Sequence, residues 1–383
     1  MDFSWSAEQM ALRDRVADFA SQDLNGDVVG RDRSGEFPHD LWRRCAEFGL
    51  LSMSVPAQYN TTGVDTDVLS AALAMEGLGY GCRDNGLAFA LTAQMWSVQH
   101  PILRFGTEEQ KRRYLPVMCA GRLIGAHAVT EPGAGSDHMA MTTLAEPVDG
   151  GYRLTGTKQY ISLAPVAGVA IVFATLDPAK GRWGLTAFLV DTDSPGCTRS
   201  AMRDKMGLRT VPMGDLVFDG CFVPSANRLG PEGAGAGIAG GTLGVERTFI
   251  LASQIGTMER QLEEAVRYAK SRRQFGQPIG KFQSVSNRIA DMKLALETAR
   301  LLLYRAAWKL ANDESVTLDA ALLKLHLSET FVKSSLDAIR IHGGSGYLTD
   351  TEVERDLRDA VGGVIYAGTS DIQRLLIARV LGL

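Results

Sequence analysis

The spacing of apolar residues changes twice along this 383-residue chain, and this change limits the possible folds more than any other feature. Up to about residue 121 apolar residues recur at helical spacing, as at Met10, Val16 and Phe19. From 122 to 232 they form short apolar or alternating runs punctuated by Gly, Pro and Asp, as in 168–174 and 185–190, which is typical of strands. From 233 to 383 helical spacing returns. We therefore predict an α+β protein with an N-terminal helical domain (1–121), a middle β domain (122–232) and a C-terminal four-helix bundle (233–383).

Local signals place several helices within this plan. Ser6 to Gln9 matches a capping box, and Thr107 is a suitable N-cap ahead of two acidic residues. Further N-terminal helices are expected over about 40–50, 66–79 and 86–104, and the clearest C-terminal helices over 258–270 and 284–312.

Residues 235–240 match the GxGxxG pattern of dinucleotide-binding proteins, with Glu259 at a suitable distance beyond them. That fingerprint requires a strand before the glycines and a second strand that carries the acid. Here a connection rich in Pro and Gly precedes the glycines, and Glu259 lies in a helical pattern. We therefore reject a doubly wound nucleotide fold and predict a flexible entry to a helix.

Composition excludes several classes of function. The net charge of −4 comes without a basic stripe, so nucleic acid is not an expected partner. The five cysteines are scattered without CxxC spacing, and the six histidines lack metal-ligand spacing, so neither disulfides nor a metal site are predicted. The N-terminus lacks the features of a signal peptide, and no apolar run is long enough to span a bilayer. We expect a cytoplasmic protein that binds no membrane.

Four segments carry the chemical signal. Residues 129–137 read Val-Thr-Glu-Pro-Gly-Ala-Gly-Ser-Asp, where glycines let the backbone approach an anionic ligand and two hydroxyls offer donors. The others are 272–283 (Arg-Arg-Gln-Phe-Gly-Gln-Pro-Ile-Gly-Lys-Phe-Gln), 341–347 (Ile-His-Gly-Gly-Ser-Gly-Tyr) and 366–374 (Tyr-Ala-Gly-Thr-Ser-Asp-Ile-Gln-Arg). In this order and spacing they resemble the acyl-CoA dehydrogenase family over essentially the whole chain. The resemblance implies an FAD-dependent oxidoreductase that acts on the CH–CH group of an acyl thioester.

The resemblance also implies which residues hold FAD. The flavin is expected along Val129, Thr130, Gly135 and Ser136, with Tyr160 and Ser162 on its other side. Tyr160 stands where the family commonly has Trp, and Leu163 where it commonly has Asn. The ADP half is expected to lie across a subunit interface on Arg272, Phe275, Gln283, Arg340, Gly343 and Gly344, with Arg340 in place of the usual Gln; Thr369 and Asp371 complete the set. A cofactor site shared between subunits implies a homo-oligomer, for which a homotetramer is the prediction and a homodimer the alternative.

The position of the catalytic base is the main departure. Many relatives carry a Glu in a Tyr-Glu-Gly-Thr segment, but this chain has Ala367 there. Glu246, followed by Arg247, matches the Glu-Arg of isovaleryl-type and long-chain members, so we predict that Glu246 is the base. The alternative is that Glu246 is a solvated helix residue paired with a neighbouring cation. Ser136, Arg247, Ala367 and Gly368 are the residues expected to contact the substrate.

The implied reaction moves the α-proton to Glu246 and the β-hydride to flavin N5, while the backbone N–H of Ala367 helps to stabilise the enolate. Trp96 and Met95 would shorten the acyl pocket if they point inward, but Trp96 could equally pack against another helix. The chain also resembles members that act on carrier-protein thioesters, including prolyl-carrier oxidation, and no residue distinguishes CoA from a carrier arm. The electron acceptor is expected to be an electron-transfer flavoprotein, with O2 as the alternative. A third hypothesis is an FAD-binding scaffold that has lost its base.

Overall fold

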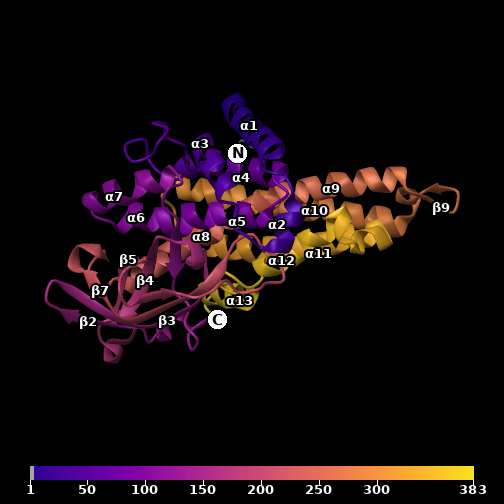
Figure 1. Ribbon diagram of the computed structural model, residues 1–383. Helices are drawn as coiled ribbons and strands as arrows, with labels where there is room; N and C mark the ends of the chain where they lie inside the picture. The colour runs from indigo at the N-terminus through magenta and orange to yellow at the C-terminus, as the bar shows by residue number, and fades with distance from the viewer. Residues whose placement is uncertain (1–3) are drawn as a thin grey trace.

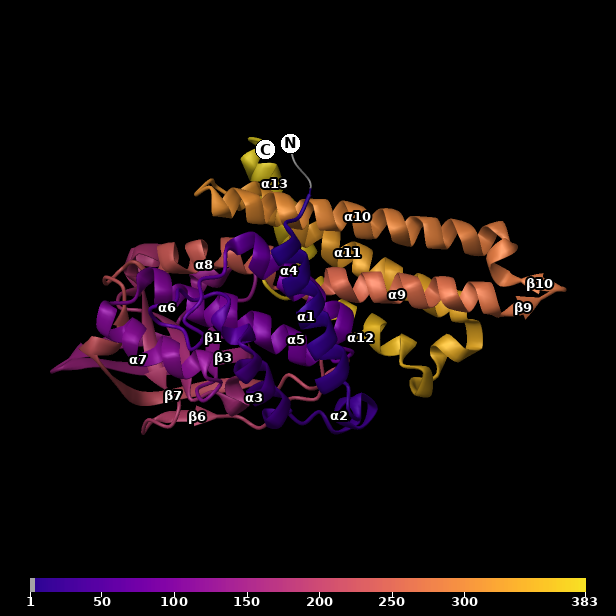
Figure 2. The same ribbon diagram turned by 90° about the horizontal axis from the view of Figure 1, so that it is seen from above.

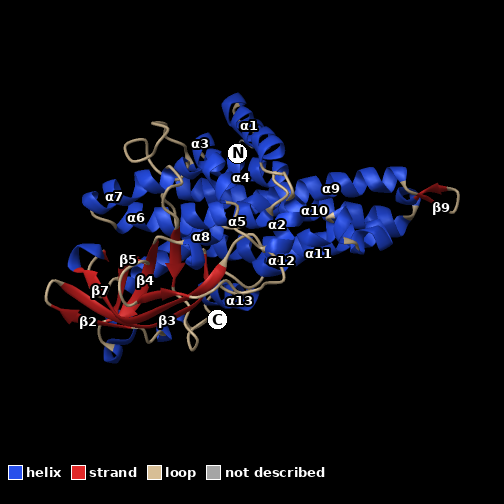
Figure 3. Ribbon diagram, viewed as in Figure 1, coloured by secondary structure: helices blue, strands red, loops and turns tan. Residues whose placement is uncertain are grey.

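The computed structural model describes residues 4–383 and places the helices and strands in separate layers (Figures 1 and 3). Ser6 and Thr107 each cap a helix through a complete capping box, which confirms both predicted helix starts. The N-terminal helices are α1 (Ala7–Asp23), α2 (Val28–Ser34), α3 (His39–Phe48), α4 (Val68–Gly81), α5 (Asn85–Ala93), α6 (His100–Phe105) and α7 (Glu108–Cys119). Between α5 and α6 the chain stays helical but widens into a π-helical segment, Gln94–Gln99.

The middle of the chain forms one mixed sheet in the order β6-β7-β3-β2-β4-β5-β8, with β1 pairing parallel to β4. Its strands are β1 (Gly125–Ala128), β2 (Leu144–Val148), β3 (Gly151–Ser162), β4 (Val169–Thr175), β5 (Leu185–Asp191), β6 (Cys197–Arg199), β7 (Met213–Pro224) and β8 (Arg228–Leu229). Every residue of β4 is buried, which explains why this strand reads as a continuous apolar run rather than an alternating one.

Helices return after β8, as the sequence predicts. They are α8 (Gly235–Phe249), α9 (Ala252–Ser271), α10 (Gln283–Ala311), α11 (Thr317–His342), α12 (Val353–Gly363) and α13 (Ser370–Val380), and the hairpin β9 (Arg273–Gln274) with β10 (Gln277–Pro278) joins α9 to α10. The GxGxxG glycines open α8, and Glu259 lies in α9, where it pairs with Arg13 at 2.5 Å. The absence of a strand–helix–strand unit here confirms that these glycines are a helix entry.

The long helices α9, α10 and α11 lie side by side and project away from the sheet, and the β9–β10 hairpin forms their far tip (Figures 1 and 2). Near the sheet they join the N-terminal helices in one apolar core, which includes Trp42, Met75, Phe249, Leu303 and Phe331. Within residues 4–383 no helix is both long and apolar enough to cross a membrane.

Candidate active site

A cavity of about 630 Å3 lies where the sheet meets the helices. It is bounded by the loop after β1, the end of β3, the π-helical segment, α8 and the turn before α13. Sequence positions more than 200 residues apart therefore meet in one place. The predicted site residues that line it are Val129, Thr130, Gly135, Ser136, Tyr160, Ser162, Glu246, Arg247, Ala367, Gly368 and Thr369.

The loop after β1 is held by a buried ion pair. The Glu131 carboxylate accepts from Lys158 Nζ at 2.8 Å and from the backbone N–H groups of Thr142 at 2.6 Å and Thr143 at 2.9 Å. Burial raises the pKa of Glu131, but the Lys158 ammonium and these hydrogen bonds outweigh burial and bring the pKa down to about 2. Because the pair is ionised and satisfied within the chain, the loop presents Thr130 to the cavity in a fixed position.

The end of β3 forms the opposite wall. A register shift between Lys158 and Ile161 turns the Tyr160 ring toward the cavity, with φ of 59° at Tyr160. Leu163 has φ of 66° and is buried. Asn tolerates this left-handed conformation better than Leu, which gives a backbone reason for the family's Asn at this position. Leu163 bears that strain and packs its side chain into the core instead.

Glu246 lies on α8 and faces the cavity with an unsatisfied carboxylate. Its Oε2 is inaccessible to solvent and has no hydrogen-bond partner within residues 4–383. Burial raises the pKa of Glu246 to about 7, against the smaller lowering effects of Arg247 and the Ser97 hydroxyl. A solvated carboxylate in an ion pair would have the opposite shift of pKa, whereas Glu246 Oε2 is buried and without a partner in the described chain.

The turn at Ala367 is clamped through its carbonyl groups. Arg247 Nε donates to the Ala367 carbonyl at 3.0 Å, and Lys324 Nζ donates to the Gly368 carbonyl at 2.6 Å. Gln373 Nε2 donates to both carbonyls, at 3.3 and 2.9 Å. Ala367 is held at φ of 52°, and its own N–H donates to no group in the described chain. The clamp thus leaves one backbone donor free beside the cavity.

Sequence reasoning missed Lys324 and Gln373. Lys324 is fully buried, and burial together with the nearby Arg247 lowers its pKa to about 8. The available signal was a single Lys in the apolar run Ala-Leu-Leu-Lys-Leu-His-Leu, residues 321–327, because a lysine seldom occupies such a position without a specific partner.

Comparison with known proteins identifies the family. Three family models match in succession: acyl-CoA dehydrogenase, N-terminal domain (residues 6–122), middle domain (126–221) and C-terminal domain (233–382). This chain belongs to the acyl-CoA dehydrogenase family.

Individual relatives cover the whole chain. An L-prolyl-[peptidyl-carrier protein] dehydrogenase from Pseudomonas fluorescens is 43% identical over 384 residues, covering 100% of both proteins. Among solved structures, the prolyl acyl carrier protein oxidase AnaB is 47% identical with a TM-score of 0.98, over 99% of this chain and 100% of AnaB. PigA with FAD and proline is 40% identical with a TM-score of 0.97 over 100% of both chains. This acyl-CoA dehydrogenase is accordingly an FAD-dependent enzyme that dehydrogenates an acyl thioester, carried either by CoA or by a carrier protein.

The cavity residues fit the flavin end of FAD. Tyr160 supplies an aromatic wall, and Thr130, Ser136 and Ser162 supply hydroxyl groups that suit the polar edge of a flavin. A Cβ added at Gly135 would meet nothing within 4 Å, so the backbone is open to a close ligand there.

The other residues expected to bind FAD lie elsewhere in this acyl-CoA dehydrogenase. Six of them are exposed and gather around the far tip of the long helices, at Arg272, Phe275, Gln283, Arg340, Gly343 and Gly344 (Figure 2). Phe275 is 92% exposed in the β9–β10 hairpin. Asp371 is also exposed and bonds Arg374, although its neighbour Thr369 lines the cavity and caps α13. One chain alone therefore does not bring the residues expected to bind the ADP half of FAD next to the cavity residues expected to bind the flavin.

The structure also shows where Trp96 and Met95 lie relative to the cavity. Trp96 stacks on Phe249 with ring centroids 4.2 Å apart, and both are buried outside the cavity lining. Trp96 and Met95 consequently do not cap the acyl pocket, whose wall is formed by Phe89, Ala93 and Ser97 instead.

His127 lines the cavity, and its ring stands edge-on to Phe173. Its Nε2 is buried without a partner, and burial lowers its pKa to about 4, so the ring is neutral near pH 7.

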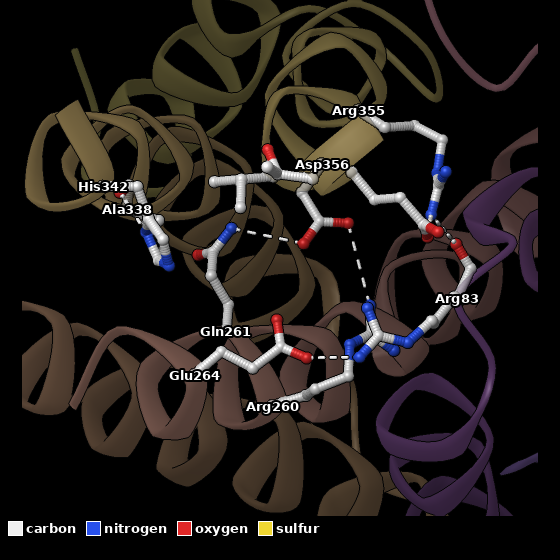
Figure 4. A pocket seen from close by; sticks show the side chains of 11 residues that line it. Arg83, Arg260, Gln261, Glu264, Ala338, His342, Arg355 and Asp356 are labelled. Carbon is white, nitrogen blue, oxygen red and sulfur yellow. Dashed lines mark hydrogen bonds and ion pairs between the residues drawn. The ribbon is translucent and has the colours of Figure 1, made fainter. Parts of the chain in front are cut away.

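A much smaller polar cavity lies among α9, α11 and α12 (Figure 4). Its charged side chains pair with one another, Arg83 with Glu264 at 2.5 Å and Arg260 with Asp356 at 3.7 Å, while Gln261 also bonds Asp356. The volume of about 10 Å3 holds no more than one water molecule. The side chains around this cavity therefore link the helices through ion pairs and hydrogen bonds, and the cavity is too small to bind a substrate.

Proposed function

We propose that Glu246 is the catalytic base of this enzyme. The observation that carries the proposal is its buried, unpartnered carboxylate, with a pKa raised to about 7, on the wall of the cavity. A base works best when its pKa lies near the working pH, because it is then both ionised and able to hold a proton. Ala367 cannot take a proton. Glu246 on α8 therefore supplies the carboxylate that many relatives carry at the position of Ala367, in the turn before α13.

The clamped turn has a complementary role. A thioester α-proton is too weakly acidic to be removed unless the enolate oxygen is stabilised. The free N–H of Ala367 is a fixed donor for that oxygen, and Arg247, Lys324 and Gln373 hold it in place through the carbonyls of the turn. Gly368 and Ser136 complete the substrate contacts. FAD, when bound, supplies the acceptor for the β-hydride.

We propose an aminoacyl group on a carrier protein as the substrate, with L-proline as the first choice. The support is the similarity over the full chain to the Pseudomonas fluorescens L-prolyl-[peptidyl-carrier protein] dehydrogenase and to the prolyl acyl carrier protein oxidase AnaB. A compact acyl group also suits a cavity that has to hold the flavin as well.

Two electron acceptors fit this reaction. An electron-transfer flavoprotein is the acceptor implied by the family resemblance, and O2 is favoured by the 47% identity to the oxidase AnaB. Mixing the anaerobically reduced enzyme with air separates them, because an oxidase recovers its flavin absorbance within the turnover time and a dehydrogenase does so far more slowly.

We propose that a second copy of the chain completes the FAD site, within a homotetramer or, alternatively, a homodimer. The six exposed residues at the tip lie far from the cavity of their own chain, so a neighbouring copy is required to bring such a tip to it. The outer face of α10 also exposes Leu294, Leu301 and Trp308 at seven-residue spacing, which is typical of a helix that packs against a partner. The domain division at 121/122 and 232/233 and the cytoplasmic location stay predictions from the sequence.

Anaerobic flavin bleaching tests the proposed reaction. Purified enzyme is mixed without oxygen with prolyl-carrier protein, prolyl-CoA and butyryl-CoA, and the loss of flavin absorbance is followed. We expect the prolyl-carrier thioester to bleach the flavin fastest. Bleaching by butyryl-CoA alone would refute the aminoacyl substrate, and bleaching by no thioester would support the scaffold hypothesis.

A further inference from the structure

The π-helical segment Gln94–Gln99 directs one polar side chain into the cavity. Ser97 lines the cavity, whereas the preceding Trp96 points away into the core against Phe249. The segment is held against β1 by Gln94, which accepts from the Gly125 N–H at 2.8 Å and donates to a neighbouring carbonyl. Insertions of π-helical geometry often occur at functional sites, because they reorient a side chain at the cost of regular hydrogen bonding. Ser97 is therefore held in a fixed position facing the cavity.

The Ser97 hydroxyl has no partner in the described chain. The residue is 4% exposed, and its Oγ is inaccessible to solvent and makes no hydrogen bond. Its neighbour is Glu246, whose pKa the hydroxyl lowers, although the two side chains do not reach the geometry of a complete hydrogen bond. Two adjacent buried polar groups thus face the cavity unsatisfied, and buried groups of this kind normally have partners.

The surrounding wall does not explain these polar groups. Phe89, Ala93, Leu243 and Ile250 line the same side of the cavity and would suit a hydrocarbon chain. The Ser97 hydroxyl hydrogen can turn to Glu246, but a plain acyl chain that fills the pocket offers no donor to Ser97 Oγ, and a buried acceptor without a donor costs free energy. A substrate with a hydrogen-bonding atom close to its α-carbon would satisfy it, since the α-carbon must lie beside Glu246.

We infer that Ser97 is a specificity-determining residue that hydrogen-bonds the amino nitrogen of an α-aminoacyl thioester, and this rests on the proposed function. The nitrogen is bonded to the same carbon that loses its proton to Glu246, so a hydroxyl beside that carboxylate is within reach of it. The substrate N–H donates to Ser97 Oγ, and the Ser97 hydroxyl hydrogen remains free to donate to Glu246. Ser97 takes no part in the transfer of the proton or the hydride, and the nitrogen keeps its N–H.

A pair of matched substrates tests this role. Prolyl-carrier protein is compared with cyclopentanecarbonyl-carrier protein, in which a CH2 group replaces the ring N–H at the same size. In the wild type we expect kcat/KM to favour the prolyl substrate by about 10-fold or more, because a site built to bond an N–H disfavours an analogue that lacks it. Ser97→Ala should lower kcat/KM for the prolyl substrate by about 10-fold or more and leave the cyclopentanecarbonyl substrate unchanged or improved. The change in this substrate ratio from the wild type to Ser97→Ala is the quantity that decides, because any intrinsic difference in α-proton acidity between the two substrates is the same for both enzymes and cancels.

Thr92→Val is the matched control, because Thr92 also carries a buried hydroxyl on this helical stretch but does not line the cavity, and its hydroxyl already donates to backbone carbonyls of Phe89 and Ile250. This control should leave the substrate ratio unchanged. An equal loss on both substrates in Ser97→Ala would overturn the inference, and so would a wild type that does not distinguish them; both results leave the dehydrogenation itself intact. If the wild type bleached with butyryl-CoA but with neither carrier substrate, the aminoacyl substrate would be wrong, and the role of Ser97 would be overturned with it.

Discussion

Replacing Glu246 by Gln should lower the turnover of the enzyme strongly and make its fold more stable at the same time. The amide has nearly the same size and fits the same cavity wall, but it cannot accept a proton. Removal of a general base commonly lowers kcat by a factor of about 10² to 10⁴. Wild-type activity should rise with pH through about 7 as Glu246 ionises, and the residual activity of the variant should lack this rise.

The gain in stability follows from the raised pKa. A pKa of about 7 in the folded enzyme, against an ordinary 4.5, means that holding the ionised carboxylate in this cavity costs about 3 kcal/mol. Below pH 4.5 the carboxyl is protonated in the folded and the unfolded chain alike, and the cost is absent. It develops between pH 4.5 and 7 and is complete above pH 7. Glu246→Gln avoids this cost, so its advantage should be near zero at pH 4.5 and about 3 kcal/mol at pH 8.

Thermal unfolding of the FAD-bound enzyme at several pH values measures this difference. For a chain of 383 residues the unfolding entropy is about 0.8 kcal/mol per kelvin, so 3 kcal/mol raises Tm by about 4 °C. Glu47→Gln is the control, since Glu47 is an exposed carboxylate on α3 and its replacement should leave the difference between the two pH values unchanged. Full activity in Glu246→Gln, or a gain in Tm that does not depend on pH, would refute the assignment of a desolvated base.

Three further changes test other parts of the structure. Lys324→Met should lower kcat more than it changes KM. It should also remove a fall in activity above about pH 8, where the buried ammonium loses its proton and its hydrogen bond to the Gly368 carbonyl loses the assistance of the charge; a pH profile parallel to that of the wild type would refute a role for the charge. Arg272→Ala should weaken FAD retention and loosen the oligomer together, measured by flavin absorbance and light scattering, and a wild type that is already monomeric would contradict the shared site. Trp96→Ala should lower the free energy of unfolding by about 3–5 kcal/mol through the lost contact with Phe249, yet leave the preference among acyl groups unchanged. A shift of this preference toward longer acyl chains would show that Trp96 limits the acyl pocket after all.

The order of helical and β domains could be predicted from the sequence because it depends on local patterns of residues. Helical spacing, capping boxes and short apolar runs each act over a few residues, and they predicted the order of helices, sheet and helices. The motif segments could likewise be matched to a family without coordinates. Glu246 was predicted to be the catalytic base because position 367 carries Ala in place of Glu. That prediction needed only a comparison of two positions in the sequence.

Only the tertiary structure decided which side chains face one another. Lys324 lies 44 positions from the carbonyl that it holds, and no local pattern specifies that pairing. Trp96 and Ser97 are adjacent in the sequence, yet the π-helical turn sends one into the core and the other into the cavity. Secondary structure is encoded by hydrogen bonding and propensity over short spans, whereas side-chain direction and desolvation depend on which distant surfaces pack together. The chemistry of this cavity, from the raised pKa of Glu246 to the unpaired hydroxyl of Ser97, is therefore a property of packing.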